Sequence, residues 1–267
     1  MVNPRISVTT ISSWNWSVEQ DIAFLKAEGV AAMGVPTTKI TGRRDEEVAA
    51  IAASGLTVTS VSAGADNGLL ETEQGALATL KPSIDLTRSM GASSLYFLTG
   101  ATPLRMATDE AFAALARCIS AALAYAKEQG VRLSIENNSV SSREIGFVHT
   151  VAGAARLCRE TGLGICLELQ NCWYEDDLPR LFRDNMDLIT MVQVSDFLIG
   201  DPLKFHRRVP GDGSMPLEWL MGQLLDAGYD GIFEIEVLGP AIEEEGYESA
   251  IRRSVGWLDE RLTRWGV

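Results

Sequence analysis

Residues 108–138 read TDEAFAALARCISAALAYAKEQGVRLSIENN and join a helical pattern to a strand pattern through one glycine. Apolar residues recur at helical spacing over Thr108–Gln129, and Thr108 is the expected N-cap. Gly130 supplies the left-handed residue that commonly ends a helix. Val131–Asn138 then alternates apolar and polar residues as a strand does. The segment therefore predicts the order helix, glycine, strand, which is the repeating unit of an α/β protein.

The same order recurs along the chain. Helical patterns that end at a glycine cover Ser17–Glu28, Asp45–Ser54, Thr150–Thr161 and Pro216–Ala227. The other seven candidate strands are Arg5–Ser13, Val30–Pro36, Leu56–Ala63, Ser93–Gly100, Leu163–Asn171, Ile189–Phe197 and Gly231–Gly239. Strands rich in Val, Ile and Leu between helices are typical of a parallel sheet that helices cover.

Eight strands in 267 residues give about 33 residues per unit, the size of a βαβ crossover. We therefore predict the α/β class and a single (β/α)8 TIM barrel domain over residues 1–267. An open doubly wound sheet is the structural alternative, and it is disfavoured because no GxGxxG follows the first strand. No Ser/Pro-rich linker or low-complexity tract divides the chain.

The chain is acidic, with 23 Lys and Arg against 36 Asp and Glu and a net charge of −13. That balance disfavours nucleic acid and anionic membranes as partners, because both are bound through basic side chains. No signal peptide or membrane span is expected, since no apolar run is long enough. The four cysteines form no CxxC pair, which favours a reducing, cytoplasmic setting. The expected partner is a small-molecule substrate, and a homo-oligomer stays open.

Side-chain parity turns several oxygen-bearing groups toward the barrel mouth. Alternate apolar residues of each strand should face the helices, so the residues between them face the lumen. The inward-facing set is Glu136, Glu168, Gln193, Glu234 and Glu236, from four consecutive strands. Because TIM-barrel active sites lie at the carboxyl ends of the strands, this set is the candidate site.

Carboxylates held close together repel one another, so a positive charge must lie among them. A divalent cation meets this need, and one residue from each strand, Glu136, Glu168, Gln193 and Glu236, gives three carboxylates and one amide, a hard, all-oxygen donor set. Mg²⁺ or Mn²⁺ is favoured, with Zn²⁺ as an alternative. The competing interpretation is that the carboxylates pair with arginine, for which Arg132, Arg207 and Arg208 are available.

Five segments resemble the xylose isomerase-like TIM barrels, a group of sugar isomerases and epimerases that includes hydroxypyruvate isomerase-like members and endonuclease IV. The segments are SIENN (134–138), LGICLELQN (163–171), MVQVSD (191–196), RRVPGDG (207–213) and GYDGIFEIE (228–236). The second half carries the motifs, and the first half matches mostly by pattern. With only His149 and His206 present, the several-histidine zinc cluster of endonuclease IV is not expected.

The resemblance implies that Glu136 and Glu236 bind a metal and flank the substrate as acid and base. Glu168 stands where the family usually has an Asp ligand. Gln193 stands where it usually has a His ligand, although hydroxypyruvate isomerase-like members have Gln there. The metal set that the resemblance implies is therefore Glu136, Glu168, Gln193 and Glu236.

Four residues are candidates for substrate binding. Asn171 stands where many members of the family have a substrate-binding His, and Arg207 matches a substrate-contacting Arg, with Arg208 as the backup. His206 lies beside Arg207, and Trp173 follows the sixth strand. For these last two, exposure to solvent and packing at the rim are the competing interpretations.

These residue types suit proton abstraction next to a metal-bound carbonyl. We therefore predict a metal-dependent isomerase or epimerase of a sugar, a polyol-derived ketone or a small hydroxy-keto acid. A dehydratase or lyase on the same scaffold begins with the same step and stays an alternative. A non-catalytic barrel subunit with a degenerate metal site is the alternative from another class. Few lysines and no phosphate-binding loop favour an unphosphorylated substrate.

Overall fold

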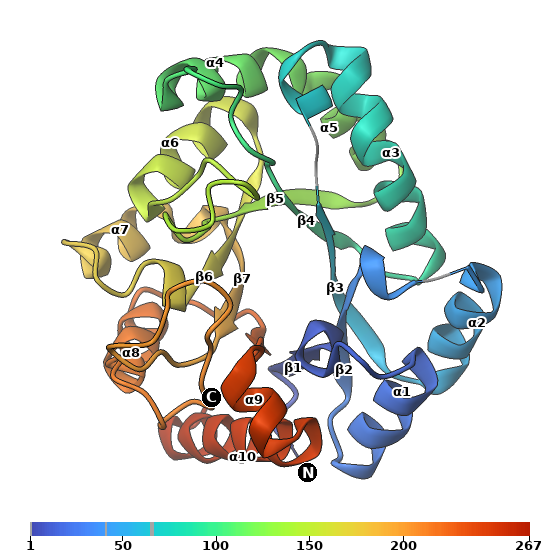
Figure 1. The fold of residues 1–267 in the computed structure, drawn as a ribbon, viewed down its shortest axis with the longest axis vertical. Coiled ribbons are helices and arrows are strands. Elements are labelled where there is room, and N and C mark those ends of the chain that lie inside the picture. Colours follow the sequence, from blue (N-terminus) through green and yellow to red (C-terminus); the bar gives the residue numbers. More distant parts are fainter. Residues whose placement is uncertain (1, 41, 65–66) are drawn as a thin grey trace.

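The computed structural model describes residues 2–40, 42–64 and 67–267. Eight parallel strands close into a barrel in sequence order, and the last strand pairs with the first (Figure 1). The strands are β1 Ile6–Thr9, β2 Ala32–Pro36, β3 Thr57–Gly64, β4 Ser94–Leu98, β5 Arg132–Glu136, β6 Gly164–Glu168, β7 Ile189–Val194 and β8 Phe233–Ile235. The predicted TIM barrel and its eight strands are confirmed.

Helices surround the barrel (Figure 1). They are α1 Val18–Ala27, α2 Arg44–Ser54, α3 Glu73–Ser89, α4 Thr108–Cys118, α5 Ser120–Glu128, α6 Val151–Thr161, α7 Leu178–Asn185, α8 Leu217–Asp226, α9 Pro240–Glu245 and α10 Tyr247–Trp265. The glycines predicted to end helices have positive φ, as at Gly55 (77°) and Gly162 (85°). Their lack of a Cβ lets the chain reverse into the next strand.

The helix predicted over 108–129 is divided in the structure. α4 ends at Cys118 and α5 begins at Ser120. The predicted N-cap is also one residue late: Ala107 holds that position, because the Glu110 carboxylate accepts a hydrogen bond from the Ala107 N–H at 2.9 Å. The Glu110 side chain thus satisfies the N–H of the N-cap residue itself, which is the half of a capping box that needs no side chain on that residue.

Several strands end earlier than their apolar patterns predicted. β6 stops at Glu168, where the Glu168 carboxylate accepts a hydrogen bond from the Gln170 N–H at 2.9 Å and a short 3-10 turn follows. β8 stops at Ile235, so Glu236 lies one residue beyond the last strand. Glu136 and Glu168 are thus the last residues of β5 and β6, and Glu236 follows the last residue of β8, so all three lie at the same end of the barrel.

The apolar core lies between the strands and the helices, and includes Phe97, Phe182 and Phe233. The lumen holds a separate small cluster of Tyr96, Cys166 and Met191. Cys166 lies two residues before Glu168 in β6, so its side chain points to the same face of the strand one layer lower. The barrel is therefore a filled core with a polar layer near one end.

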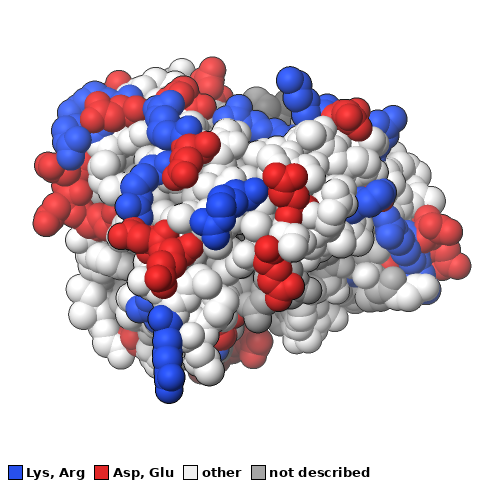
Figure 2. Space-filling view, turned by 90° about the horizontal axis from the view of Figure 1, so that it is seen from above, with Lys and Arg blue, Asp and Glu red and all other residues white. Residues whose placement is uncertain are grey.

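The surface carries charges of both signs. On one flank, Lys and Arg side chains alternate with Asp and Glu side chains, and neither gathers into a patch of one sign (Figure 2). The described residues contain no helix that is both long and apolar enough to cross a membrane.

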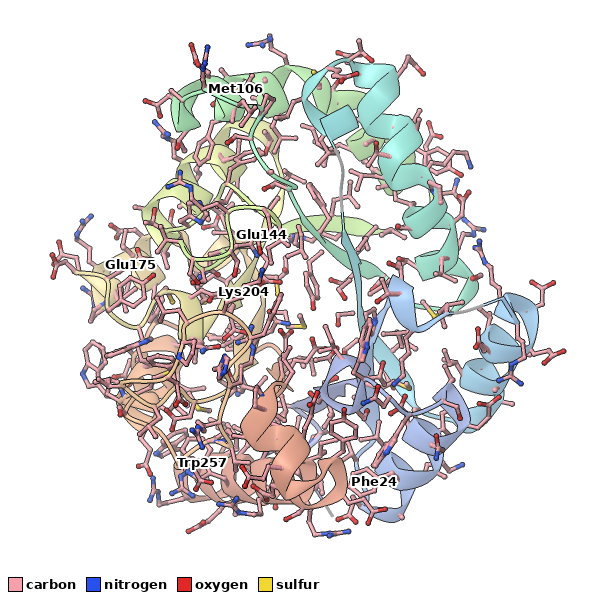
Figure 3. The ribbon with its side chains drawn as sticks, viewed as in Figure 1. Phe24, Met106, Glu144, Glu175, Lys204 and Trp257 are labelled. Atoms are coloured by element: carbon pink, nitrogen blue, oxygen red, sulfur yellow. The ribbon has the colours of Figure 1, made fainter. Side chains whose placement is uncertain are left out.

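Glu175 lies between β6 and α7 and contacts the start of α6 (Figure 3). Both of its carboxylate oxygens accept from the Val151 N–H at 3.0 Å. Burial nevertheless raises the pKa of Glu175 to about 7. The folded state therefore binds this proton more tightly than the unfolded chain does. The protonated Glu175 therefore contributes to the free energy of unfolding in full below about pH 4.5, and this contribution is lost as the pH rises through about 7.

We expect Glu175→Gln to be more stable than the wild type at pH 8 and equal to it near pH 4. The amide stays neutral and keeps an acceptor for Val151. After discounting for solvent screening of a partly exposed group, the gain is about 1 kcal/mol, or roughly 2–4 °C in Tm. Thermal unfolding at both pH values measures it. Glu244→Gln, on the exposed side of α9, is the matched control, and an equal gain there would contradict the explanation.

Candidate active site

A cavity of about 260 Å³ opens at the carboxyl ends of the strands. Its polar lining includes Tyr96, Glu136, Gln170, Asn171, Arg207 and Glu236. The same cavity has apolar walls, which come from the loops that follow several strands. The residues of the candidate site thus meet a space that a small molecule can enter.

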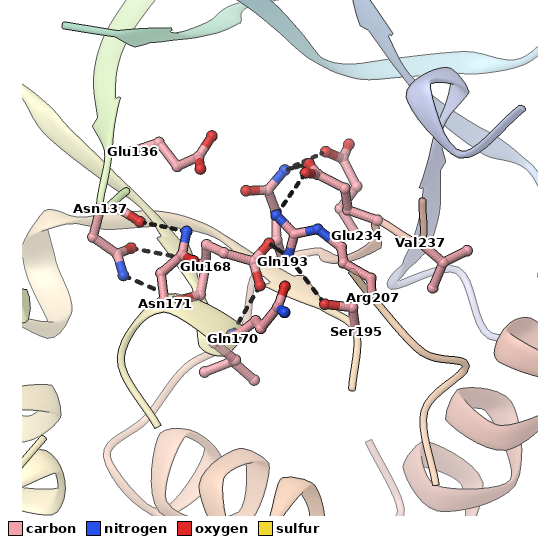
Figure 4. A network of polar contacts seen from close by, with 12 residues as sticks. Glu136, Asn137, Glu168, Gln170, Asn171, Gln193, Ser195, Arg207, Glu234 and Val237 are labelled. Atoms are coloured by element: carbon pink, nitrogen blue, oxygen red, sulfur yellow. Dashed lines mark hydrogen bonds and ion pairs between the residues drawn. The ribbon is translucent and has the colours of Figure 1, made fainter. Parts of the chain in front are cut away.

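Arg207 is the positive charge among the buried carboxylates. Its guanidinium lies 2.9 Å from Glu168 Oε2 and 3.0 Å from Glu236 Oε1, and all three side chains are buried (Figure 4). It also donates to Ser195 Oγ at 3.1 Å. The need for a cation that the sequence implied is therefore met at least in part by arginine. A buried charge of this kind is stable only because its partners are charged and close.

The other two arginines considered for this role lie elsewhere. Arg208 pairs with Asp201 at 2.8 Å in the loop after β7. Arg132, at the opposite end of β5 from Glu136, donates to the Asp187 carbonyl at 3.4 Å. The structure thus separates Arg207 from its neighbour in the sequence, because consecutive residues in an extended loop point in opposite directions.

Gln193 connects the carboxylates from β7. Its amide nitrogen donates to Glu236 Oε2, and lies 3.0 Å from Tyr96 Oη and 3.5 Å from Glu234 Oε1. Glu234 in turn accepts from Ser60 Oγ at 2.7 Å. We call Glu168, Gln193, Glu234, Glu236 and Arg207 the mouth network. Gln193, Glu168 and Glu234 are fully buried beneath the cavity, whereas Arg207 and Glu236 reach its surface.

Glu136 faces the same space from β5 (Figure 4). Its carboxylate accepts from Asn138 Nδ2 at 3.1 Å. Burial, with the added negative charges of Glu236 and Glu168, raises the pKa of Glu136 well above its ordinary value. Burial likewise raises the pKa of Glu236 to about 7, although Arg207 lowers it, and raises that of Glu234 to about 8. Carboxyl groups that gain and lose protons near neutrality can act as general acids and bases.

Asn137 holds Glu168 in place, a role that the sequence analysis did not predict for this residue of the SIENN motif. Its side chain donates to the Glu168 carbonyl at 3.1 Å and accepts from the Glu168 N–H at 2.8 Å. Asn171 then donates to the Asn137 carbonyl at 2.9 Å. The signal was the second residue of ENN, which strand parity turns away from the lumen, but no local pattern identifies Glu168 as its partner.

We expect Asn137→Ala to destabilise the protein by about 2–4 kcal/mol, because a buried N–H and a buried C=O both lose their partner. The ordered position of Glu168 should be disturbed as well. Chemical denaturation measures the loss. Asn185→Ala removes one half-buried hydrogen bond to the Leu181 carbonyl and is the matched control, with an expected loss of about 1 kcal/mol. Equal losses for the two variants would contradict the role of Asn137.

The structure places the four substrate-binding candidates differently. Asn171 and Arg207 line the cavity. The His206 side chain lies against the Lys204 carbonyl, with Nδ1 at 2.7 Å from it. The backbone carbonyl of His206 accepts a hydrogen bond from Gln170 Nε2, a residue of the cavity lining, at 3.1 Å. Trp173 packs against the core and is not among the described residues that line the cavity.

The donors that would hold a divalent cation are Glu136, Glu168, Gln193 and Glu236. In the described parts of the chain, no three His, Cys, Asp or Glu side chains are already spaced as a metal site. The chemistry of the set still fits a hard cation, because Arg207 is a single positive charge against several buried carboxyl groups. Glu168 Oε2, moreover, has this ion pair but no hydrogen bond among the described groups.

Fold and site together define a TIM barrel with buried carboxyl, amide and guanidinium groups at the carboxyl ends of its last four strands. The sequence pattern of the xylose isomerase-like TIM barrel family matches residues 22–261. The chain belongs to this family.

Solved structures agree with the fold at low sequence identity. A protein from Sinorhizobium meliloti 1021 has a TM-score of 0.84 at 19% identity, with 97% of each chain covered. The zinc-bound IolI protein has a TM-score of 0.81 at 13% identity, with 99% of each chain covered. The 3-keto-D-glucoside 4-epimerase YcjR from E. coli scores 0.76 at 20% identity, covering 96% of this chain and 99% of its own. No curated protein matches the chain significantly.

Proposed function

We propose that the protein is an isomerase or epimerase that moves a proton on the carbon next to a carbonyl group. The substrate class is a sugar, a polyol-derived ketone or a small hydroxy-keto acid. One observation carries the proposal: Glu136 and Glu236, both with raised pKa values, line one cavity together with a buried arginine. The presence of epimerases among the structural neighbours supports the same reaction class.

The residues divide the reaction between them. Glu236, in its ionised form, removes the substrate proton and keeps it, and Glu136, in its protonated form, donates its own proton to the opposite face, or the two act in the reverse order. Arg207 donates hydrogen bonds to the substrate oxygen on which negative charge develops. Glu168, Gln193 and Ser195 hold Arg207 and Glu236 in position. These side chains are buried, so the interactions among them are stronger than they would be in solution.

We propose further that a divalent cation binds among Glu136, Glu168, Gln193 and Glu236, with Mn²⁺ or Mg²⁺ favoured and Zn²⁺ as the alternative. When bound there, the cation would act as a Lewis acid toward the substrate carbonyl. The IolI protein, which has the same fold, was solved with zinc. In this chain the cation and Arg207 would share Glu168 and Glu236, so the carboxylates must serve two positive partners.

Deuterium exchange tests the reaction. The protein, as purified and after dialysis against EDTA, is incubated in D₂O with a panel of ketoses and hydroxy-keto acids, and its metal content is measured in parallel. Deuterium on the carbon next to the carbonyl, reduced by EDTA and restored by Mn²⁺, is the expected result. Exchange that survives complete metal removal would leave Arg207 as the only electrophile. Release of water with an ultraviolet-absorbing product would indicate a dehydratase, and no exchange on any substrate would contradict the proposal.

A further inference from the structure

The outer half of the cavity is apolar. Its lining there includes Trp14, Leu98, Ile145, Leu203, Phe205 and Leu238. Trp14, Leu203 and Phe205 are 50%, 45% and 47% exposed, although such side chains are usually covered by other residues. They come from two loops, after β1 and after β7, that line the same cavity. The apolar wall, as we call these six residues, thus shares this cavity with Glu136 and Glu236.

The position of Phe205 is built into the fold. Its φ is 53°, a left-handed conformation that is rare for a bulky residue. Gly239 makes this possible, since a Cβ at Gly239 would lie 2.0 Å from the Phe205 carbonyl oxygen. The segment is also tied by the hydrogen bond from the Arg207 N–H to the Leu238 carbonyl, at 3.0 Å. A strained residue held by its surroundings next to a site is a reason to examine its function.

The same loop is tied across the mouth. Lys204 forms an ion pair with Glu144, which belongs to the loop after β5, and the two side chains lie together near the mouth (Figure 3). Gln170 Nε2 also donates a hydrogen bond, at 3.1 Å, to the carbonyl of His206, the residue that follows Phe205. The Phe205 ring therefore stands on a segment that is fixed from several sides.

Apart from the cation proposed above, the described residues that line the cavity offer a charged substrate no positive side chain without a carboxylate partner. Arg207 is the only Lys or Arg among the described residues that line it, and it is already paired with Glu168 and Glu236. Lys204, the nearest lysine in the sequence, is paired with Glu144. A phosphate group would enter beside buried carboxyl groups without a cation of its own, which is unfavourable.

We propose, on the basis of the function proposed above, that the substrate is uncharged and carries an apolar substituent of about the size of a phenyl ring. The hydroxylated part lies over Glu136, Asn171 and Glu236, and the substituent lies against the apolar wall. Phe205 and Trp14 are the residues that determine this specificity. Burial of an aromatic ring against such a wall supplies affinity through the hydrophobic effect.

Calorimetric titration with matched probes tests the proposal. Phenyl β-D-glucopyranoside should bind about ten times more tightly than methyl β-D-glucopyranoside, and glucose 6-phosphate should bind no more tightly than glucose. Phe205→Ala and Trp14→Ala should each remove most of the preference for the phenyl glucoside over the methyl glucoside. Tyr174→Ala is the matched control, because Tyr174 is 51% exposed and does not line the cavity.

Three results would overturn the proposal: equal affinities for the phenyl and methyl glucosides, tighter binding of the phosphate, or no binding of the phenyl glucoside at millimolar concentration. A dimer in solution that buries Phe205 and Trp14 would also overturn it, since the wall would then be an interface. These outcomes differ from failure of the proposed reaction. A phenyl preference without deuterium exchange would show a binding site that lacks the chemistry.

Discussion

Glu236→Gln should reduce deuterium exchange by about 10²–10⁴-fold, the usual contribution of a general acid or base. The amide has almost the shape of the carboxyl group but cannot accept the substrate proton. Its oxygen can still accept from Arg207, so the fold should be preserved. The measurement is the exchange rate in D₂O at a saturating concentration of a substrate found by the panel, with the circular dichroism spectrum as the check on folding.

Glu243→Gln, on the exposed surface of α9, is the matched control and should exchange at the wild-type rate. Glu136→Gln should also be slow, but the two variants should differ in which proton they affect. If the enzyme is an epimerase, each variant should lose exchange with a different one of the two epimers, because the two carboxyl groups act from opposite faces of the reacting carbon. Wild-type exchange by the Glu236 variant would exclude Glu236 as the base.

Arg207→Met should destabilise the metal-free protein by about 3–5 kcal/mol at pH 8, a fall in Tm of roughly 10 °C. Methionine fills much of the volume of arginine but leaves Glu168 and Glu236 buried without their positive partner. The loss should be smaller at pH 5. There the carboxyl groups can take up protons in place of the lost charge, as the raised pKa of Glu236 already indicates.

Arg208→Met is the matched control, since its ion pair with Asp201 is partly exposed and should be worth no more than about 1 kcal/mol. Excess Mn²⁺ should stabilise Arg207→Met more than it stabilises the wild type, because the cation would no longer share Glu168 and Glu236 with a guanidinium. A Tm unchanged by Arg207→Met at pH 8 would show that the mouth network does not depend on this charge. Mn²⁺ without effect on either protein would count against the proposed metal site.

Local information was enough to predict the barrel. Helical periodicity, a glycine that can take positive φ and a short apolar strand are each read within about fifteen residues, and their repetition leaves few alternatives. The alternation of side chains along a strand needs no long-range contact either. Glu136, Glu168, Gln193 and Glu236 could therefore be assigned to the mouth from the sequence, and the structure brings them to one cavity or directly beneath it.

What tertiary structure decided is how the buried negative charge is compensated. Arg132, Arg207 and Arg208 were all available in the sequence as partners of the buried carboxylates. Only the path of the loop after β7 brings Arg207 between Glu168 and Glu236. Tertiary structure likewise determines the pairing of Asn137 with Glu168 and the left-handed conformation of Phe205 beside Gly239. Each depends on how two segments far apart in the chain approach one another, and periodicity, which reports only near neighbours, carries no information about that approach.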